Sequence, residues 1–261
     1  MTRHTRVLLS VVFWAFVVYL FVPLVLMVLM GFKDSRFIGF PITAWTTDWY
    51  VGVFEDGDVM ASFAYSMAIA VISTLFSLVI GTWVAAFLQP YSFPGKFIVF
   101  ALMCLPAVVP GIISAIALRV AARVVEIEPG MTAIIIGHTI HNVPFVALVV
   151  MARLSTLPKS QVEAAKDLGA DGLIAFMRVT LPYLRPALIG AAVFCMLLSF
   201  DDFVRSFFLG GYQPTLPVLI FAELRSGMSP QINAIATVVL VLTAVLGLWA
   251  ERSMRRMKKA R

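Results

Sequence analysis

Charged residues are scarce in this chain. They make up 13% of the 261 residues, whereas hydrophobic residues make up 61%. A soluble domain carries about twice that share of charge. The composition therefore excludes an ordinary soluble domain and indicates a protein that lies in a membrane.

Cysteines and phosphate-binding glycines are scarce too. Cys104 and Cys195 lie in apolar runs without Cys-x-x-Cys spacing, so we interpret them as packing residues rather than a redox or metal motif. An ATP-binding Gly-x4-Gly-Lys loop is missing, because Pro90 stands where Gly95-Lys96 would need its first glycine. We therefore expect no ATP hydrolysis by the chain alone.

Six long apolar runs dominate the sequence. Runs of about 18 or more apolar residues predict transmembrane helices, and continuous rather than alternating hydrophobicity favours helices over a β-barrel. The runs are Val7–Met30, Ser62–Leu88, Phe97–Leu118, Met131–Ala152, Ala187–Leu209 and Ile232–Ala250. The first is too long for a signal peptide and lacks a cleavage site, so we interpret it as a retained helix. We predict an all-α, polytopic membrane protein in which residues 1–261 form one transmembrane domain.

The basic residues predict the orientation of these helices. When the N-terminus is placed in the cytoplasm, fourteen of the twenty Lys and Arg residues fall on the cytoplasmic side. Cytoplasmic loops of membrane proteins carry such an excess, so we predict that both termini are cytoplasmic. The net charge of +6 then reflects membrane topology, and no nucleic-acid partner is expected.

The longest cytoplasmic loop, residues 153–185, is the most polar part of the chain. Ser160 and Glu163 have the spacing of a capping box, which predicts the start of a helix. Gly169 predicts its end, because glycine adopts the left-handed cap without strain. Asp171 is expected to cap a second helix, which Pro182 would end. Two short helices between membrane spans predict a docking element that enters a groove on a soluble partner.

This loop resembles the cytoplasmic signature of ABC-importer permeases. The residues that match it are Glu163, Ala164, Ala165, Gly169, Leu181 and Pro182. Further residues resemble the polyamine-importer branch, in particular the C-type permease of spermidine/putrescine importers: His138 with Pro144, and residues 199–204, 216–218 and 225–237. The resemblance covers essentially the whole chain.

The resemblance implies the type I ABC importer permease fold, with six transmembrane helices and a cytoplasmic coupling helix. It implies import of a small organic cation, in particular a polyamine, by a subunit without catalytic residues or cofactor. The implied partners are a second homologous permease, two cytoplasmic subunits that carry ATP and Mg, and an external solute-binding protein. The implied location is the bacterial inner membrane. The six matching loop residues would couple the chain to the ATP-binding subunits.

Charged residues near the outer side are candidates for the substrate pathway. Inserting a charged side chain into a membrane span costs about 3 kcal/mol, so the presence of such a residue suggests that it has a functional role. A free carboxylate of Asp201 or Asp202 would attract an amine cation, and Arg205 is close enough in sequence to neutralise one of them. A purely structural ion pair stays open as the alternative. Glu223 is a further candidate, in the proline-bounded segment 213–230 that is expected to form a gating helix, although a surface charge fits it too.

Two other interpretations stay open. His138 and His141 lie one helical turn apart, but no third ligand is spaced for a metal, so we predict helix-packing hydrogen bonds. An intramembrane enzyme would use either the His138/His141 or the Asp201/Asp202 pair, although adjacent aspartates do not suit a protease dyad. The same importer fold would also serve 2-aminoethylphosphonate, ferric ion, an opine or an amino-acid-like compound.

Overall fold

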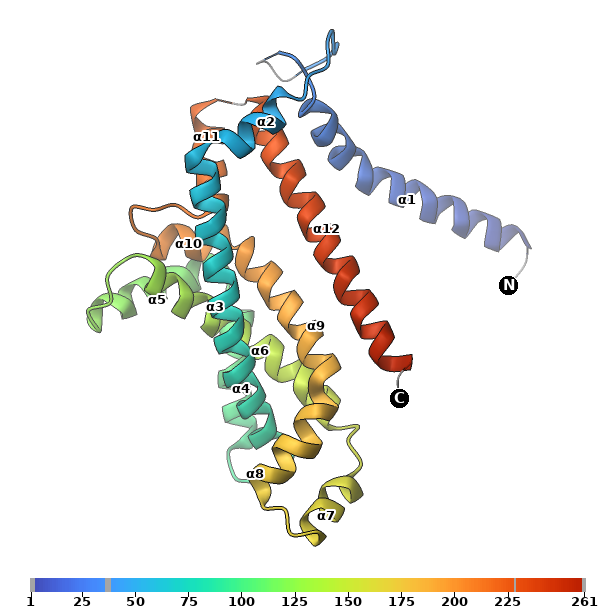
Figure 1. Cartoon of the computed structure of the whole chain (residues 1–261), viewed down its shortest axis with the longest axis vertical. Coiled ribbons are helices and arrows are strands. Elements are labelled where there is room, and N and C mark those ends of the chain that lie inside the picture. The colour runs from blue at the N-terminus through green and yellow to red at the C-terminus, as the bar shows by residue number, and fades with distance from the viewer. Residues whose placement is uncertain (1–2, 36–38, 228, 260–261) are drawn as a thin grey trace. The chain divides into compact units, whose positions relative to one another are not determined.

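The computed structural model describes residues 3–35, 39–227 and 229–259, without the side chains at 254 and 256–259. Most of the basic tail after Arg252 therefore lies outside the described side chains. The helices are α1 (Arg3–Met30), α2 (Asp48–Glu55), α3 (Gly57–Leu88), α4 (Lys96–Val108), α5 (Gly111–Val124), α6 (Met131–Leu154), α7 (Lys159–Asp167), α8 (Gly172–Ala175), the π-helix η1 (Phe176–Thr180), α9 (Leu181–Phe200), α10 (Phe203–Leu209), α11 (Leu216–Ser226) and α12 (Pro230–Lys259), as labelled in Figure 1. The chain is thus all-α, as predicted.

Five helical segments are long and apolar enough to cross a membrane, and the bent pair α4 and α5 makes a sixth candidate. The predicted span Phe97–Leu118 is therefore not one continuous helix, because the two helices meet at an angle of 107°. Pro110 explains the break. It has no backbone N–H and disfavours helical geometry in the preceding residue, and Val109 is accordingly extended, with φ −67° and ψ 133°.

The fifth span is also displaced from its predicted position. Its helical segment runs from Gly172 to Phe200, so Pro182 does not end a helix as expected. Pro182 instead lies in the first turn of α9, directly after the π-helix η1. Proline removes one hydrogen bond from a helix, and here the segment continues through Pro182, with the π-helix on its N-terminal side. The predicted end at Leu209 is wrong as well, since α9 stops at Phe200.

The chain divides into two compact units. The first contains residues 1–61 and 219–244. In it, the short helix α2 lies in the segment between α1 and α3. The ring of Tyr50 packs against Phe32 with centroids 4.5 Å apart, and Gln231 of α12 donates a hydrogen bond of 3.1 Å to Asp56. These contacts join α2 and the residue after it to the segment that follows α1 and to the start of α12.

The second unit contains residues 62–218 and 245–261. Its core consists of small and aliphatic side chains from α3, α6 and α9: Ala85, Val146, Ala147, Val150, Leu184, Ala191 and Cys195. Full burial of Cys195 agrees with its interpretation as a packing residue. Figure 1 shows α5 and α10 at one end of this unit and α7 and α8 at the other. The α9–α10 junction and the loop 153–185, which carry the candidate site residues, therefore lie towards opposite ends of this unit.

Candidate functional site

The break between α9 and α10 positions the predicted pathway residues. Asp201 follows the last turn of α9, and Asp202 is the N-cap of α10. The carboxylate of Asp202 accepts a hydrogen bond of 2.9 Å from the backbone N–H of Arg205, as expected of a good capping residue. The sequence suggested that both aspartates lie on one continuous helix. The structure places them instead in the turn between two helices.

Asp202 and Arg205 form a buried ion pair. The Nη1 atom of Arg205 donates a 2.6 Å hydrogen bond to Oδ2 of Asp202, and the Arg205 and Asp202 side chains are 6% and 8% exposed. Such a pair is electrically neutral to its surroundings, and breaking it by removing one partner leaves an uncompensated buried charge. The predicted neutralisation of one aspartate by Arg205 is thus present, and the aspartate concerned is Asp202.

Asp201 has a different environment. Its residue is exposed, and its backbone N–H and carbonyl are bonded to Leu197 and Phe203 respectively. Among the described residues, no hydrogen bond or ion pair holds its carboxylate. Of the two adjacent aspartates, the one available to a cation is therefore Asp201.

A polar network lies behind this break and was not predicted in full. The Nδ1 atom of His138 on α6 lies 2.6 Å from the Ser199 hydroxyl on α9. The Ser199 hydroxyl lies 2.9 Å from that of Ser73 on α3, which in turn donates to the carbonyl of Ala70. The network therefore fastens three helices together. The sequence signal is a row of serines in the second span at near-helical spacing, Ser62, Ser66, Ser73 and Ser77.

One set of proton positions satisfies this network. If the Ser73 hydroxyl donates to the Ala70 carbonyl, it accepts from Ser199, and Ser199 then accepts from Nδ1–H of His138. The Nε2 atom of His138 is left as an acceptor, facing the Ser206 hydroxyl at 3.4 Å. Its 3.9 Å distance from Asp202 Oδ2 is too long for a hydrogen bond. The contacts of His138 with Ser199 on α9 and Ser206 on α10 are the helix-packing hydrogen bonds that the sequence predicted.

His141 joins the two breaks in the helices. Its Nδ1 atom lies 2.8 Å from Nη2 of Arg205 and 3.1 Å from the carbonyl oxygen of Pro106 in α4. That carbonyl has no helical partner because residue 110 is a proline without N–H. An arginine always donates, so Nδ1 accepts when it bonds Arg205 and donates when it bonds Pro106. The imidazole thus lies between the α4–α5 break and α10.

The loop between α6 and α9 is the second candidate site. The predicted capping box is absent: Pro158 is the N-cap of α7, and no side chain caps that end. The predicted end is correct, since Gly169 has φ +88°. Its N–H bonds to Lys166 and that of Ala170 bonds to Ala165, which is the Schellman arrangement.

The second cap of the loop is also as predicted. Asp171 accepts a 2.7 Å hydrogen bond from the N–H of Ile174 at the start of α8. The base of the loop is held by Arg153, whose guanidinium lies 4.0 Å from the ring centre of Tyr183, and by the Tyr183 hydroxyl, which donates to the Thr156 carbonyl. These contacts join the end of α6 to the first turn of α9.

The surface of α7 suits a docking element. Val162 and Ala165 are half-buried, whereas Glu163 and Ala164 are exposed, and Leu168 at its end is 90% exposed. Glu163 lines a cavity of about 560 Å³ between α7, α8 and the α3–α4 loop. The helix thus presents a mixed polar and apolar surface that ends in an exposed leucine.

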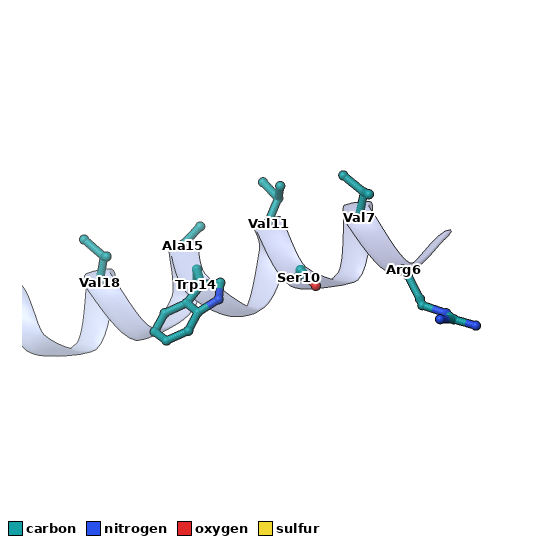
Figure 2. Close-up of a pocket in the computed structure, with 7 residues that line it drawn as sticks. All are labelled: Arg6, Val7, Ser10, Val11, Trp14, Ala15 and Val18. Carbon is teal, nitrogen blue, oxygen red and sulfur yellow. The ribbon is translucent and has the colours of Figure 1, made fainter. Parts of the chain in front are cut away.

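The remaining candidates lie elsewhere. Glu223 is half-buried on α11, so a helix is present where the gating segment was expected. A pocket lies along α1, and Figure 2 shows the side chains that line it. Its lining is Arg6, Val7, Ser10, Val11, Trp14, Ala15 and Val18. This face is mostly apolar and offers lipid or another helix a surface rather than a substrate a binding site.

Comparison with known proteins gives consistent matches. Residues 77–260 match the family described as binding-protein-dependent transport system inner membrane component. The spermidine/putrescine transport system permease protein PotC of Escherichia coli (strain K12) is 33% identical over 229 residues, which cover 87% of this chain and 86% of PotC. The putrescine transport system permease protein PotI of the same strain is 32% identical over 251 residues, covering 93% and 89%.

A solved structure shares the fold. A chain of a bacterial ABC transporter involved in the import of the acidic polysaccharide alginate superimposes with a TM-score of 0.75 at 18% identity, over 97% of this chain and 94% of that one. The predicted permease fold is therefore confirmed.

Proposed function

Because the chain belongs to the family of binding-protein-dependent transport system inner membrane components, we propose that it forms half of the membrane pathway of an ATP-driven importer for a small organic cation, a polyamine in particular. The similarity to PotC and PotI carries the choice of substrate class. The exposed carboxylate of Asp201 supports it, since a carboxylate near a low-dielectric pathway attracts an ammonium group.

In this proposal the loop 153–185, called the docking loop below, transmits the energy of ATP hydrolysis to the membrane helices. Two cytoplasmic subunits bind ATP and Mg, and one of them receives α7, with Glu163, Ala164 and Ala165 along the helix and Gly169 at its end. Leu181 and Pro182 start α9, so a movement of α7 is passed to the fifth span through η1. The exposure of Leu168 supports this contact.

Two further partners complete the machine. A second, homologous permease covers the exposed apolar helix faces that lipid does not cover. An external solute-binding protein delivers the cation on the side of the membrane nearer α10. Both termini are cytoplasmic in the bacterial inner membrane, and Glu223 on α11 is a second candidate for contact with the arriving substrate.

Reconstitution tests the substrate class. The permease pair, its ATP-binding subunits and the binding protein are placed in proteoliposomes, and uptake of labelled 1,4-diaminobutane and spermidine is measured together with ATP hydrolysis. We expect both amines to stimulate hydrolysis and to accumulate. Stimulation by 2-aminoethylphosphonate, ferric ion or an opine, with none by either amine, would reject the polyamine and keep the importer.

A matched pair of variants tests the docking loop. Leu168→Asp places a charge at the exposed end of α7 and is expected to reduce co-purification of the ATP-binding subunits at least about tenfold, the equivalent of about 1.4 kcal/mol. Leu173→Asp, at another exposed leucine of the loop, serves as the control. Equal retention of the ATP-binding subunits by both variants would contradict docking at the end of α7.

A further inference from the structure

We infer that Arg205 is a built-in counterion that withdraws Asp202 from the substrate pathway, so that this subunit offers the cation a single carboxylate, that of Asp201. The inference rests on the proposed function and makes it more specific. Two adjacent aspartates in a sequence suggest a doubly negative site for two ammonium groups. The contacts at the α9–α10 break assign them different roles.

Both carboxylate oxygens of Asp202 are already used. Oδ1 accepts the backbone N–H of Arg205 at 2.9 Å and Oδ2 accepts its Nη1 at 2.6 Å. The pair is buried from solvent. An arriving ammonium would have to displace a guanidinium that is held in two places and cannot lose its proton.

Arg205 is held from the other side as well. Its Nη2 lies 2.8 Å from Nδ1 of His141, and its Nε is buried without a partner among the described residues. The guanidinium is thus fixed between α10 and α6 and does not reach towards the exposed Asp201. Arg205 is therefore a positioning residue, which acts on the substrate only by occupying Asp202.

The net charge of this region follows directly. Asp202 and Arg205 cancel, and His141 is neutral when it accepts from Arg205, so Asp201 leaves one negative charge. A single negative charge complements one ammonium group. We therefore assign to this subunit the recognition of one ammonium group of the substrate, while any second ammonium group is met elsewhere in the assembled pathway.

A double-mutant cycle on the complete transporter tests this assignment. Asp202→Asn keeps an N-cap side chain and removes only the charge, and Arg205→Met keeps the apolar stem. Each single variant is expected to lower the melting temperature of the purified complex, because it leaves one buried charge without its partner. The double variant D202N/R205M is expected to recover most of that loss, since it buries no charge.

Uptake of 1,4-diaminobutane provides the readout that a merely structural role would not move. We expect D202N/R205M to keep the KM for uptake within about twofold of the unmodified transporter, and Asp201→Asn to raise it about tenfold or more without lowering the melting temperature. A double variant that is stable but has lost uptake would overturn the inference, because Asp202 would then serve the substrate directly.

The two proposals fail in different ways. If the unmodified transporter takes up no amine, the proposed substrate class fails, and the melting temperatures still decide whether Asp202 and Arg205 neutralise each other. If the double variant melts no higher than the two single variants, the pair is not self-contained and the inference fails, whatever the substrate is.

Discussion

At the scale of single residues, the left-handed backbone at Gly169 is the clearest constraint in the docking loop. Its φ of +88° is unfavourable for any residue with a side chain, although no neighbouring atom lies within 4 Å of the place that a Cβ atom would take. The cost to a residue other than glycine is about 1–2 kcal/mol. The cap therefore depends on backbone conformation and not on space.

Gly169→Val is expected to distort the end of α7 and to reduce co-purification of the ATP-binding subunits. Gly172→Val is a matched control, since Gly172 also has open space around it but no positive φ. The measurement is the ratio of ATP-binding subunit to permease after affinity purification. Similar ratios in the two variants would show that the left-handed cap does not matter for docking.

The hydroxyl of Ser199 is expected to stabilise the membrane domain. Ser199→Ala removes the acceptor for Nδ1 of His138 and a partner of Ser73, and an unsatisfied buried polar group costs about 1–3 kcal/mol. Thermal unfolding in detergent should show a lower midpoint. Ser226→Ala is the control, because among the residues that the structure describes this exposed hydroxyl bonds only the Glu223 carbonyl one turn back, and its midpoint should stay unchanged.

Residue patterns predicted the local features of the loop but not all of them. Gly169 and Asp171 act within three to five residues of themselves, so their caps were readable from the sequence. The capping box at Ser160 and Glu163 was wrong because Pro158 takes the N-cap position and Ser160 is already inside α7. The pairing of His138 with Ser199 was beyond sequence reasoning, since it depends on how α6 packs against α9.

At the scale of helices, the close approach of α3 and α6 depends on Gly81. A Cβ atom at this position would lie 2.7 Å from Cβ of Val146 and 3.1 Å from the carbonyl oxygen of Val143. Val146 is fully buried, so neither neighbour is the free end of a flexible side chain. Small residues allow such close helix packing in membranes.

Gly81→Ala is therefore expected to lower the thermal midpoint, because α3 and α6 must separate, and overpacking of this kind costs about 1–3 kcal/mol. Gly247→Ala makes the same change in a membrane helix with no atom within 4 Å, and is expected to be neutral or slightly stabilising. A midpoint for Gly81→Ala equal to that of Gly247→Ala would contradict the close approach.

The apolar runs overlap each candidate membrane segment among the described residues, but they gave no sign of the breaks within two of the predicted spans. Hydrophobicity averages over about 18 residues, whereas Val109-Pro110 and Asp201-Asp202 each interrupt a helix at a single dipeptide. Both breaks had local signals that the averages hide. Pro110 cannot donate a hydrogen bond, and Asp202 stands three residues before the N–H group that it caps.

At the scale of the whole molecule, the distribution of basic residues determines the orientation that we propose. Fourteen of twenty Lys and Arg residues fall on the cytoplasmic side of that arrangement, and six of these belong to the tail from Arg252 to Arg261. The other eight precede the first span or lie in the loops before the last one. The bias therefore persists without the tail, and earlier loops govern orientation as each span inserts.

Truncation after Arg252 is accordingly expected to leave the orientation unchanged. The background for the measurement is a chain in which Cys104 and Cys195 are replaced. A single new cysteine is introduced either in the loop 153–185 or in the loop 125–130, and each variant is treated with a thiol reagent that does not cross membranes. In intact cells the second position should react and the first should not, with or without the tail. Reaction in the loop 153–185 before lysis would place the docking helix outside the cell, where no ATP-binding subunit can reach it.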